Sequence, residues 1–537
     1  MRPIKKLLKI LSIFAVLPIS TFLFFSLTPQ ITYSANYPLE IIQPLSGLTT
    51  KSRFYKAYPG LEYNVKVAAI GGEYPYQYAL TMAPSGMTID TSTGFISWSK
   101  PTTSGSPYSV TARVTDSKST QQSVSWTIIV TTSGFYFLDA VNGSHNLARG
   151  GTGTGTISNP WKDMQDFYGG PTNISIQPAA KNDKSYAGGY LYFRTGTYES
   201  GAMPAEDTGG CEVRVPFVLD SKPQVWLAYP GDSPTISFKS YAMQFYSDSG
   251  NIYTDGIHFR MNGNPMARGL RFSGGSKNNT IIRNIFDGDG MVGNSCSNNA
   301  MLMTTGGIGN PGDSERWVIS HNTFTDIKGG IGFLAYSTDK VLLEGNLVNG
   351  QGGNHSLYAK TENSNWHVRG NKIINSSGNG YLFGGYGYSN GNINVYHNYI
   401  SMNSGNAVYL NEQWATTTAG PFRVFRNTLV GGVEIKNVKS TNGPWYYTDN
   451  VIINGTGGDK LTKTAIDFPT NLIISGTLSA TSGLINSDGL LLDAYSGYKG
   501  VKGWQFKDGS TPFDGVYVPS ASSNIIPPSG FKFKSAQ

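Results

Sequence analysis

The sequence predicts an all-β protein whose main body is a right-handed parallel β-helix. Charged residues make up only 14% of the chain, against roughly 25% in ordinary soluble proteins. Glycine (66 residues) and tyrosine (32) are abundant, which suits short strands joined by tight turns and disfavours helical bundles. A short asparagine-containing phrase recurs every 23 to 38 residues from Asn284 to Asn450. Self-similarity at that period is typical of a solenoid.

Residues 1–35 are predicted to be an export signal or, if uncleaved, an N-terminal membrane anchor. Basic residues between Arg2 and Lys9 precede an apolar run from Ile10 to Leu27, and Tyr33-Ser34-Ala35 offers a cleavage site. The apolar run lies near the lower length limit for crossing a bilayer, so both alternatives stay open. We therefore expect a secreted or cell-surface protein that contacts a membrane only through this segment.

The same segment accounts for most of the net charge. It holds four basic residues and no acid, and without it the net charge falls from +7 to +3. No basic cluster follows it, so we do not expect nucleic acid as a partner. Cys211 and Cys296 are the two cysteines of the chain. In an oxidising compartment they either form one disulfide or remain two thiols.

Residues 37–132 are predicted to form a β-sandwich. Apolar and polar residues alternate in Tyr63–Val67 and in Tyr108–Val114, as in half-buried strands. Between these strands, Pro84–Asp90 is followed by Thr93–Trp98. The two segments resemble the pattern of bacterial Ig-like, cadherin-like modules, P-x-G-hydrophobic-x-I-D followed by T-G-x-I-x-W. The resemblance implies a spacer or adhesion unit, and we assign no chemistry to it.

Calcium is a cofactor of some cadherin relatives, and a calcium requirement is left open here. In this module Asp90 and Asp116 are the acids in suitable places. Two isolated carboxylates fall short of the six to eight oxygen ligands that calcium takes. We therefore interpret both as turn-capping residues and assign no metal ligand and no other cofactor.

Residues 135–455 are predicted to form the β-helix. Its repeated phrase is built around seven asparagines: Asn284, Asn322, Asn346, Asn371, Asn398, Asn427 and Asn450. The short strands of one coil cannot bury an apolar face alone, so the coils must stack to form one continuous core. An asparagine at the same height in each turn can hydrogen-bond to the next along the axis, and it tolerates turn geometry. We therefore expect an asparagine ladder.

Both ends of this region have their own signals. Leu191–Tyr198 and Tyr229–Asp232 resemble the first coil and an early turn of the pectate-lyase-like β-helix superfamily. Residues 456–537 lose the asparagine repeat. They are predicted to form irregular final coils and a C-terminal cap, which a solenoid needs to protect its last strands.

Counting from each ladder asparagine predicts which side chains face outward. The residues ten, twelve and fourteen positions after each ladder asparagine are expected to face outward. They alternate with apolar residues such as Leu382, which are expected to face inward. The outward positions that carry rings or charges are Tyr336, Tyr358, Lys360, Tyr381, Phe383 and Glu412. Rings that stack on sugar faces, with a base and an acid for a uronate, favour a polysaccharide-binding face. The alternative is an aromatic ladder covered by a loop.

A second column of polar residues lies in the strand before each asparagine. Glu344 and Arg369 fall on neighbouring coils and are expected to pair. We interpret them as a surface ion pair worth at most about 1 kcal/mol, with a catalytic role as the alternative. His321 and His397 directly precede ladder asparagines and are interpreted as turn residues.

The carboxylate pattern does not favour a glycoside hydrolase. Such enzymes use paired carboxylates, and polygalacturonases add a Gly-His-Gly turn and an Arg-x-Lys one coil later. Asp287 and Asp289 come nearest to this set, but neither the histidine nor the Arg-x-Lys follows them. We therefore interpret both as turn residues.

A lyase is supported by a different resemblance. A lyase needs a base to take the proton beside a uronate carboxyl, and a cation to stabilise the charge that develops. Ser356–Lys360 and the coil after it resemble the alginate lyase and chondroitinase B family, which implies Lys360 as the base. Leu382–Gly385 replaces the arginine segment of that family. Lys360 would therefore have to act with Arg369 or His355.

Two classes of function follow. The first is an exported enzyme that binds and cleaves an extracellular or cell-wall polysaccharide by β-elimination. The second is a non-catalytic adhesin or glycan-binding shaft that uses the Ig-like module as a spacer.

Overall fold

The computed structural model describes most of the chain between residues 37 and 474. The described ranges are 37–47, 52–168, 189–199, 212–214, 224–238, 242–245, 250–261, 268–273, 275–289, 300–306, 314–352, 355–387, 390–415, 420–436, 445–448, 450–453, 466–467 and 472–474. The export segment, both cysteines and most of the predicted C-terminal cap lie outside these ranges. Within them, no helix is both long and apolar enough to cross a membrane.

The N-terminal module is a sandwich of short sheets. β1 (Glu40–Gln43) pairs with β4 (Ala68–Ile70); β2 (Lys56–Ala57), β9 (Gln121–Val130), β8 (Tyr108–Thr115) and β5 (Gln77–Met82) form a second sheet; β3 (Tyr63–Lys66), β7 (Phe95–Trp98) and β6 (Met87–Ile89) form a third. Alternate residues of β9, from Val124 to Val130, are buried. The predicted Ig-like β-sandwich is confirmed.

Asp90 and Asp116 cap turns, as predicted. The Asp90 carboxylate accepts hydrogen bonds from the backbone N–H groups of Ser92 and Thr93 at 2.9 and 2.8 Å. The Asp116 carboxylate accepts one from the backbone N–H of Thr120 at 2.7 Å. Both therefore serve the local turn.

The rest of the described chain is a parallel β-helix, which confirms the predicted architecture. One strand of each coil contributes to a twelve-stranded parallel sheet, here called the first sheet. Its strands are β10 (Phe135–Leu138), β11 (Gly189–Phe193), β14 (Gln224–Ala228), β17 (Ile252–Asp255), β20 (Asn279–Ile282), β23 (Glu315–Ser320), β26 (Asp339–Glu344), β29 (Ser364–Arg369), β31 (Gly391–Tyr396), β33 (Phe422–Phe425), β35 (Trp445–Thr448) and β37 (Ile466–Asp467).

Two further strands complete a typical coil. The short-strand ladder contains β12 (Gly196–Glu199), β15 (Pro234–Ser237), β18 (His258–Arg260), β21 (Ile285–Asp287), β24 (Thr323–Thr325) and β27 (Leu347–Asn349). The long-strand ladder contains β13 (Glu212–Arg214), β16 (Ala242–Phe245), β19 (Arg268–Ser273), β22 (Ala300–Thr305), β25 (Ile331–Tyr336) and β28 (His355–Thr361). Both continue in β30 (Lys372–Gly387), β32 (Tyr399–Ala415) and β34 (Thr428–Lys436), and β36 (Val451–Ile453) and β38 (Leu472–Ile474) extend the short-strand ladder.

The predicted asparagine ladder joins the first sheet to the short strands. Asn322 donates its backbone N–H to Asn346 Oδ1 at 2.9 Å, and Asn346 donates to Asn371 Oδ1 at 2.9 Å. The side-chain amides repeat this pattern from Asn284 to Asn450. The residue before each of the first six ladder asparagines is left-handed, as at His321 (φ 57°) and His397 (φ 56°). Their predicted role as turn residues is confirmed.

Apolar side chains fill the inside of the solenoid along its axis. Phe259, Phe286 and Phe324 occupy the same position on successive short strands, with ring centroids 5.1 and 4.8 Å apart. In the first coil, Trp161 stacks on Tyr136 of β10, with ring centroids 5.2 Å apart. Stacked identical positions make one continuous core, as a solenoid requires.

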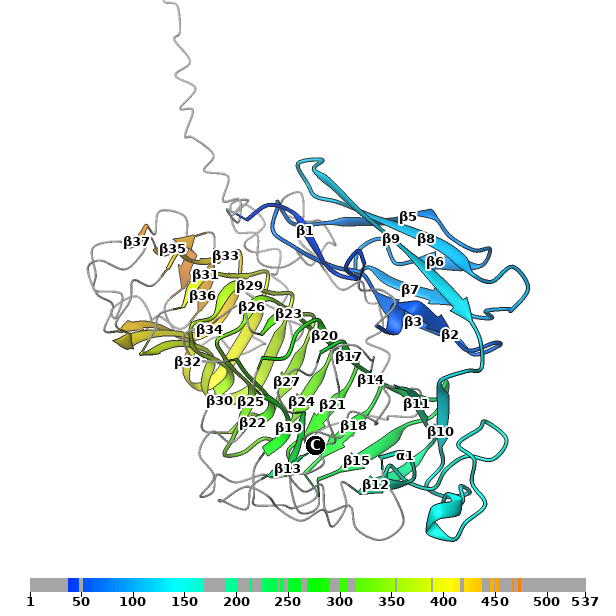
Figure 1. Ribbon diagram of the computed structural model, residues 1–537. Coiled ribbons are helices and arrows are strands. Elements are labelled where there is room, and N and C mark those ends of the chain that lie inside the picture. The colour runs from blue at the N-terminus through cyan, green and yellow to red at the C-terminus, as the bar shows by residue number, and fades with distance from the viewer. Residues whose placement is uncertain are drawn as a thin grey trace, which may run out of the picture.

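The Ig-like module lies along the outer face of the first sheet (Figure 1). One apolar cluster contains Val65 and Tyr78 of the module together with Val318, Leu342 and Tyr396 of the solenoid. The module is therefore packed on the β-helix and does not project from it as a spacer. The faces left for a ligand are those of the short and long strands.

Candidate functional site

The outer face of the long-strand ladder carries a column of large side chains. Parallel register aligns Met303, Leu334, Tyr358, Leu382 and Tyr409 on successive strands. Met303 and Leu334 form a small cluster separate from the solenoid core. Tyr336 and Tyr358 are half-buried against that cluster. The predicted outward position of both tyrosines is confirmed.

Lys360 joins this face through a β-bulge. Ala335 pairs with Ala359, but Tyr336 pairs with Thr361, so Lys360 is the extra residue of β28. A bulge redirects the side chain at the extra residue. Here Lys360 Nζ lies 5.0 Å from the centroid of the Tyr336 ring and 5.9 Å from that of Tyr358. The flanking rings provide cation–π attraction, and burial lowers the pKa of Lys360 below its usual value.

Polar groups flank the tyrosines on the same strands. The His355 ring packs edge-on against Tyr358, with centroids 5.1 Å apart. The Asn379 amide donates to His355 Nδ1 at 3.1 Å, so the neutral ring carries its proton on Nε2. Asn411 donates its amide to the Tyr409 hydroxyl at 3.2 Å. We call Tyr336, His355, Tyr358, Lys360 and Tyr409 the Lys360 face.

Tyr381 and Phe383 do not belong to the Lys360 face, which corrects the prediction. Both are buried in the solenoid core, and Leu382, expected inside, takes the outward position. Leu357 lies eleven positions after its ladder asparagine, Asn346. It pairs with Tyr381, which lies ten positions after Asn371, so the turn after Asn371 is one residue shorter than the turn after Asn346. A one-residue shift moves every side chain to the opposite face of a strand.

The structure does not bring the remaining candidate residues to this face. Glu412 lies in β32, and its side chain is outside the described part of the chain. Arg369 ends β29 of the first sheet and is fully buried beneath the Ig-like module. Of the two residues considered as partners for Lys360, His355 is therefore the one on the same strand, five residues before it.

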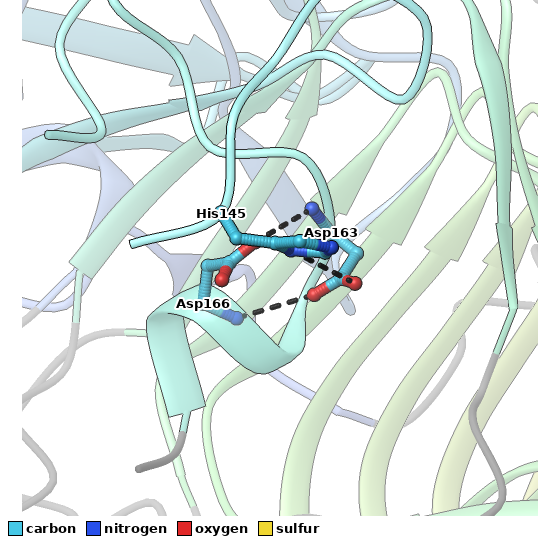
Figure 2. Close-up of side chains that lie close together, drawn as sticks. All are labelled: His145, Asp163 and Asp166. Atoms are coloured by element: carbon cyan, nitrogen blue, oxygen red, sulfur yellow. Dashed lines mark hydrogen bonds and ion pairs between the residues drawn. The ribbon is translucent and has the colours of Figure 1, made fainter. Parts of the chain in front are cut away.

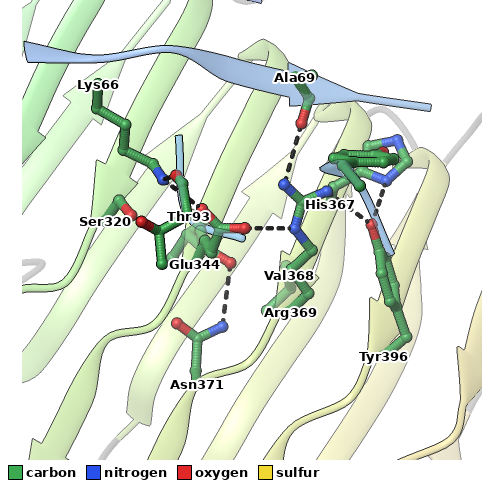
Figure 3. A network of polar contacts seen from close by, with 12 residues as sticks. Lys66, Ala69, Thr93, Ser320, Glu344, His367, Val368, Arg369, Asn371 and Tyr396 are labelled. Carbon is green, nitrogen blue, oxygen red and sulfur yellow. Dashed lines mark hydrogen bonds and ion pairs between the residues drawn. The ribbon is translucent and has the colours of Figure 1, made fainter. Parts of the chain in front are cut away.

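Arg369 belongs to a buried ionic cluster between the module and the solenoid (Figure 3). Its Nε lies 2.7 Å from Glu344 Oε1, and its terminal nitrogen donates to the backbone oxygen of Ala69 at 3.1 Å. Lys66 of the module approaches the other Glu344 oxygen at 2.8 Å. The predicted pairing of Glu344 with Arg369 is confirmed, but the pair is buried and not on the surface. Removing one partner of such a pair is strongly destabilising.

A second polar group on the outer surface was not predicted from the sequence. His258 Nε2 lies 3.4 Å from Asp287 Oδ2, and Arg260 lies 2.8 Å from Asp289 Oδ1. The histidine and arginine stand one coil before the two acids, whereas the polygalacturonase pattern has them one coil after. Burial raises the pKa of Asp287, but hydrogen bonds from His258 and the Asp289 N–H outweigh it and leave that pKa below its usual value. A glycosidase general acid needs the opposite shift.

One cluster in the described residues has donor atoms grouped closely enough for a metal ion. One ligand atom from each of His145, Asp163 and Asp166 lies within 4.8 Å of the others (Figure 2). Arg149 already places its guanidinium 2.6 Å from Asp163 Oδ1 and 2.9 Å from Asp166 Oδ1. The arginine thus supplies the positive charge, and the cluster fastens the 145–149 turn to α1 (Gln165–Tyr168).

Comparison with known proteins identifies the module. Residues 46–131 match the family described as Putative Ig domain. No curated protein matches the chain.

Comparison with solved structures finds weak likenesses. The A-module of a mannuronan C-5 epimerase from Azotobacter vinelandii is 13% identical over 57% of this chain and 95% of that one, with a TM-score of 0.22. The catalytic domain of a GH87 alpha-1,3-glucanase in complex with nigerose is 9% identical over 78% and 85%, with a TM-score of 0.25.

A putative alpha-galactosidase from Bacteroides fragilis is 12% identical over 39% of this chain, with a TM-score of 0.15. The match spans 37% of that chain's length. All these scores are low, and the assignment of the parallel β-helix rests on the strand pairing described above.

Proposed function

We propose that the protein is exported and binds an acidic extracellular polysaccharide along the Lys360 face. The observation that carries this proposal is the bulged position of Lys360 between the rings of Tyr336 and Tyr358. A cation beside half-buried rings suits a chain of sugar rings that bear carboxylates. The rings contact the sugar faces, and the ammonium pairs with a uronate.

The spacing of the rings supports a ligand that extends along the solenoid axis. Tyr358 and Tyr409 lie in the same column, two coils apart. Parallel strands are about 4.8 Å apart, so roughly 10 Å separates the two backbones. A polymer can therefore contact both rings at once, whereas a single sugar ring contacts one.

Cleavage by β-elimination is a second candidate, favoured by one observation. Burial lowers the pKa of Lys360, which moves the amine towards the neutral form that a general base needs. His355, with its proton on Nε2, would then serve as hydrogen-bond donor to the substrate in place of the buried Arg369. The binding proposal does not depend on this step.

The test is polysaccharide binding by calorimetry, with alginate and pectate as acidic ligands and a neutral glucan for comparison. Lys360→Met should weaken uronate binding about tenfold, as expected for loss of one charge-assisted contact. Lys328→Met is the matched control, because the Lys328 side chain is 63% exposed and lies in the turn between β24 and β25. Unchanged uronate affinity in Lys360→Met would overturn the proposal.

Absorbance from new unsaturated ends tests cleavage in the same samples. Activity that Lys360→Met abolishes would support the lyase. Binding without any absorbance change would exclude β-elimination on those polymers and leave a glycan-binding protein.

A further inference from the structure

Three of the six histidines of the chain lie where the Ig-like module meets the first sheet. The His321 ring packs against Phe95 of β7, with centroids 5.0 Å apart. His367 packs against Tyr37 at 6.4 Å, and His397 packs against Tyr74 at 5.2 Å. Histidines in an interface give it a means of responding to pH near neutrality.

His321 faces two cationic and two anionic side chains. The module contributes Lys66 from β3 and Asp90 from the turn after β6, and the solenoid contributes Glu344 from β26 and Arg283 from the turn after β20. Glu344 already pairs with Lys66 and Arg369. A proton on His321 would therefore add positive charge to a buried cluster whose nearest carboxylate is already shared by two cations.

His367 is in a similar position two coils further on. Arg369 and Arg423 are the charged groups that face it. Its Nδ1 lies 3.1 Å from the Tyr396 hydroxyl, and Tyr37 of the module covers the ring. Burial and the two arginines both hold the pKa of His367 well below its usual value.

We propose that the contact between the Ig-like module and the first sheet is an acid-sensitive clamp, closed while His321 and His367 are neutral and loosened when they must take up protons. Neither residue belongs to the Lys360 face, so this inference is independent of the proposed function. The module would hold the solenoid firmly at neutral pH and detach more readily in acid.

The direction of the effect follows from proton linkage. Burial lowers the pKa of His321 to about 3 in the closed contact, and in an open contact it would return to about 6.5. The open state then binds more protons below pH 6.5, so the closed state loses stability as pH falls from about 6.5 to about 3. For His321 alone, the opening constant should rise on the order of 30-fold between pH 7.5 and pH 5.

Glu344, which is also buried in this contact, titrates at lower pH than the histidines in the open contact. The pKa of Glu344 is about 2 because Arg369 and Lys66 outweigh the effect of its burial. Its contribution is complete above about pH 4.5 and is lost as pH falls towards 2. A change between pH 7.5 and 5 therefore reports the histidines and not Glu344.

The experiment cuts the linker and measures how tightly the module stays bound. A protease site inserted between Thr132 and Ser133 of the full chain allows one cleavage after folding. The dissociation constant of the module is then measured at pH 7.5 and pH 5. We expect it to rise at least 30-fold in acid for the wild-type contact, and by less than about threefold for the double variant His321→Gln, His367→Gln. His258→Gln, on the short-strand ladder, should keep the full response.

Two results would overturn the clamp: a wild-type dissociation constant that is the same at both pH values, or a double variant that keeps the full acid response. If the double variant fails to fold, the proposal is tested on the wild-type protein by measuring proton uptake when the module dissociates. Calorimetry at pH 5.5 in two buffers of different ionisation enthalpy counts the protons taken up on dissociation. Uptake of one to two protons supports the clamp, and no uptake contradicts it.

Discussion

Replacing Glu344 by glutamine should be among the most damaging single polar changes in this fold. The substitution keeps the size of the side chain but removes the one charge that both Lys66 and Arg369 contact, at 2.8 and 2.7 Å. Both cations are fully buried. The pKa of Glu344, about 2 against a usual 4.5, corresponds to about 3 kcal/mol at 1.36 kcal/mol per unit. Breaking buried pairs typically costs about 3 to 5 kcal/mol.

Urea unfolding at pH 7, followed by far-ultraviolet circular dichroism, measures this loss. Glu40→Gln is the matched control, because Glu40 also joins the module to the solenoid, 2.9 Å from Lys340, but at the partly exposed edge of the contact. It should cost at most about 1 kcal/mol. Equal losses for the two variants would refute the view that burial makes the Glu344 cluster strong.

Three other predictions concern the ladder, the two kinds of tyrosine and the module. Asn371→Ala should lower the free energy of unfolding by about 1 to 3 kcal/mol, because it leaves the buried backbone N–H of Asn346 without its acceptor. Asn403→Ala, at an exposed position, should be nearly neutral in the same urea unfolding experiment. Tyr381→Ala should cost about 3 to 5 kcal/mol without changing polysaccharide affinity, whereas Tyr358→Ala should weaken binding about threefold to tenfold at nearly unchanged Tm. Deleting residues 37–131 should increase the binding of a hydrophobic fluorescent dye, since it uncovers the apolar first sheet; unchanged dye binding would contradict this.

The solenoid could be predicted from the sequence because its strongest interactions repeat. Each ladder asparagine bonds to the next, so the same residue must recur once per coil. The faces were harder to predict, because strand alternation is reliable only after the length of the preceding turn is known. The turn after Asn371 is one residue short, and this alone placed Tyr381 and Phe383 on the wrong face. Lys360 and Tyr358 lie before that turn, and their position was predicted correctly.

The docking of the module could not be predicted. Arg369 and Ala69 are 300 residues apart in the chain, and no periodic pattern connects them. Lys66 alternates with apolar neighbours in β3 as an exposed strand lysine would. The pairing of Glu344 with Arg369 was visible because both lie on the repeat, but nothing in the repeat shows that another module covers them. In the missed polar group, Arg260 and Asp287 stand at matching repeat positions, and His258 lies two residues before Arg260 on the same strand. A search of the repeat in both directions along the coils would have found this group.

The way the module lies on the solenoid also bears on how this protein can change in length. Repeat proteins commonly evolve by gaining or losing whole repeats. Here the module contacts successive coils in order, from Glu40 on Lys340, through Ala69 on Arg369, to Glu73, which lies 3.8 Å from Arg426. An added or deleted coil between these points would shift every later partner by about 4.8 Å. The Ig-like module thus fixes the number of coils that it contacts. Insertions of whole coils should be tolerated only where the module makes no contact, after β33.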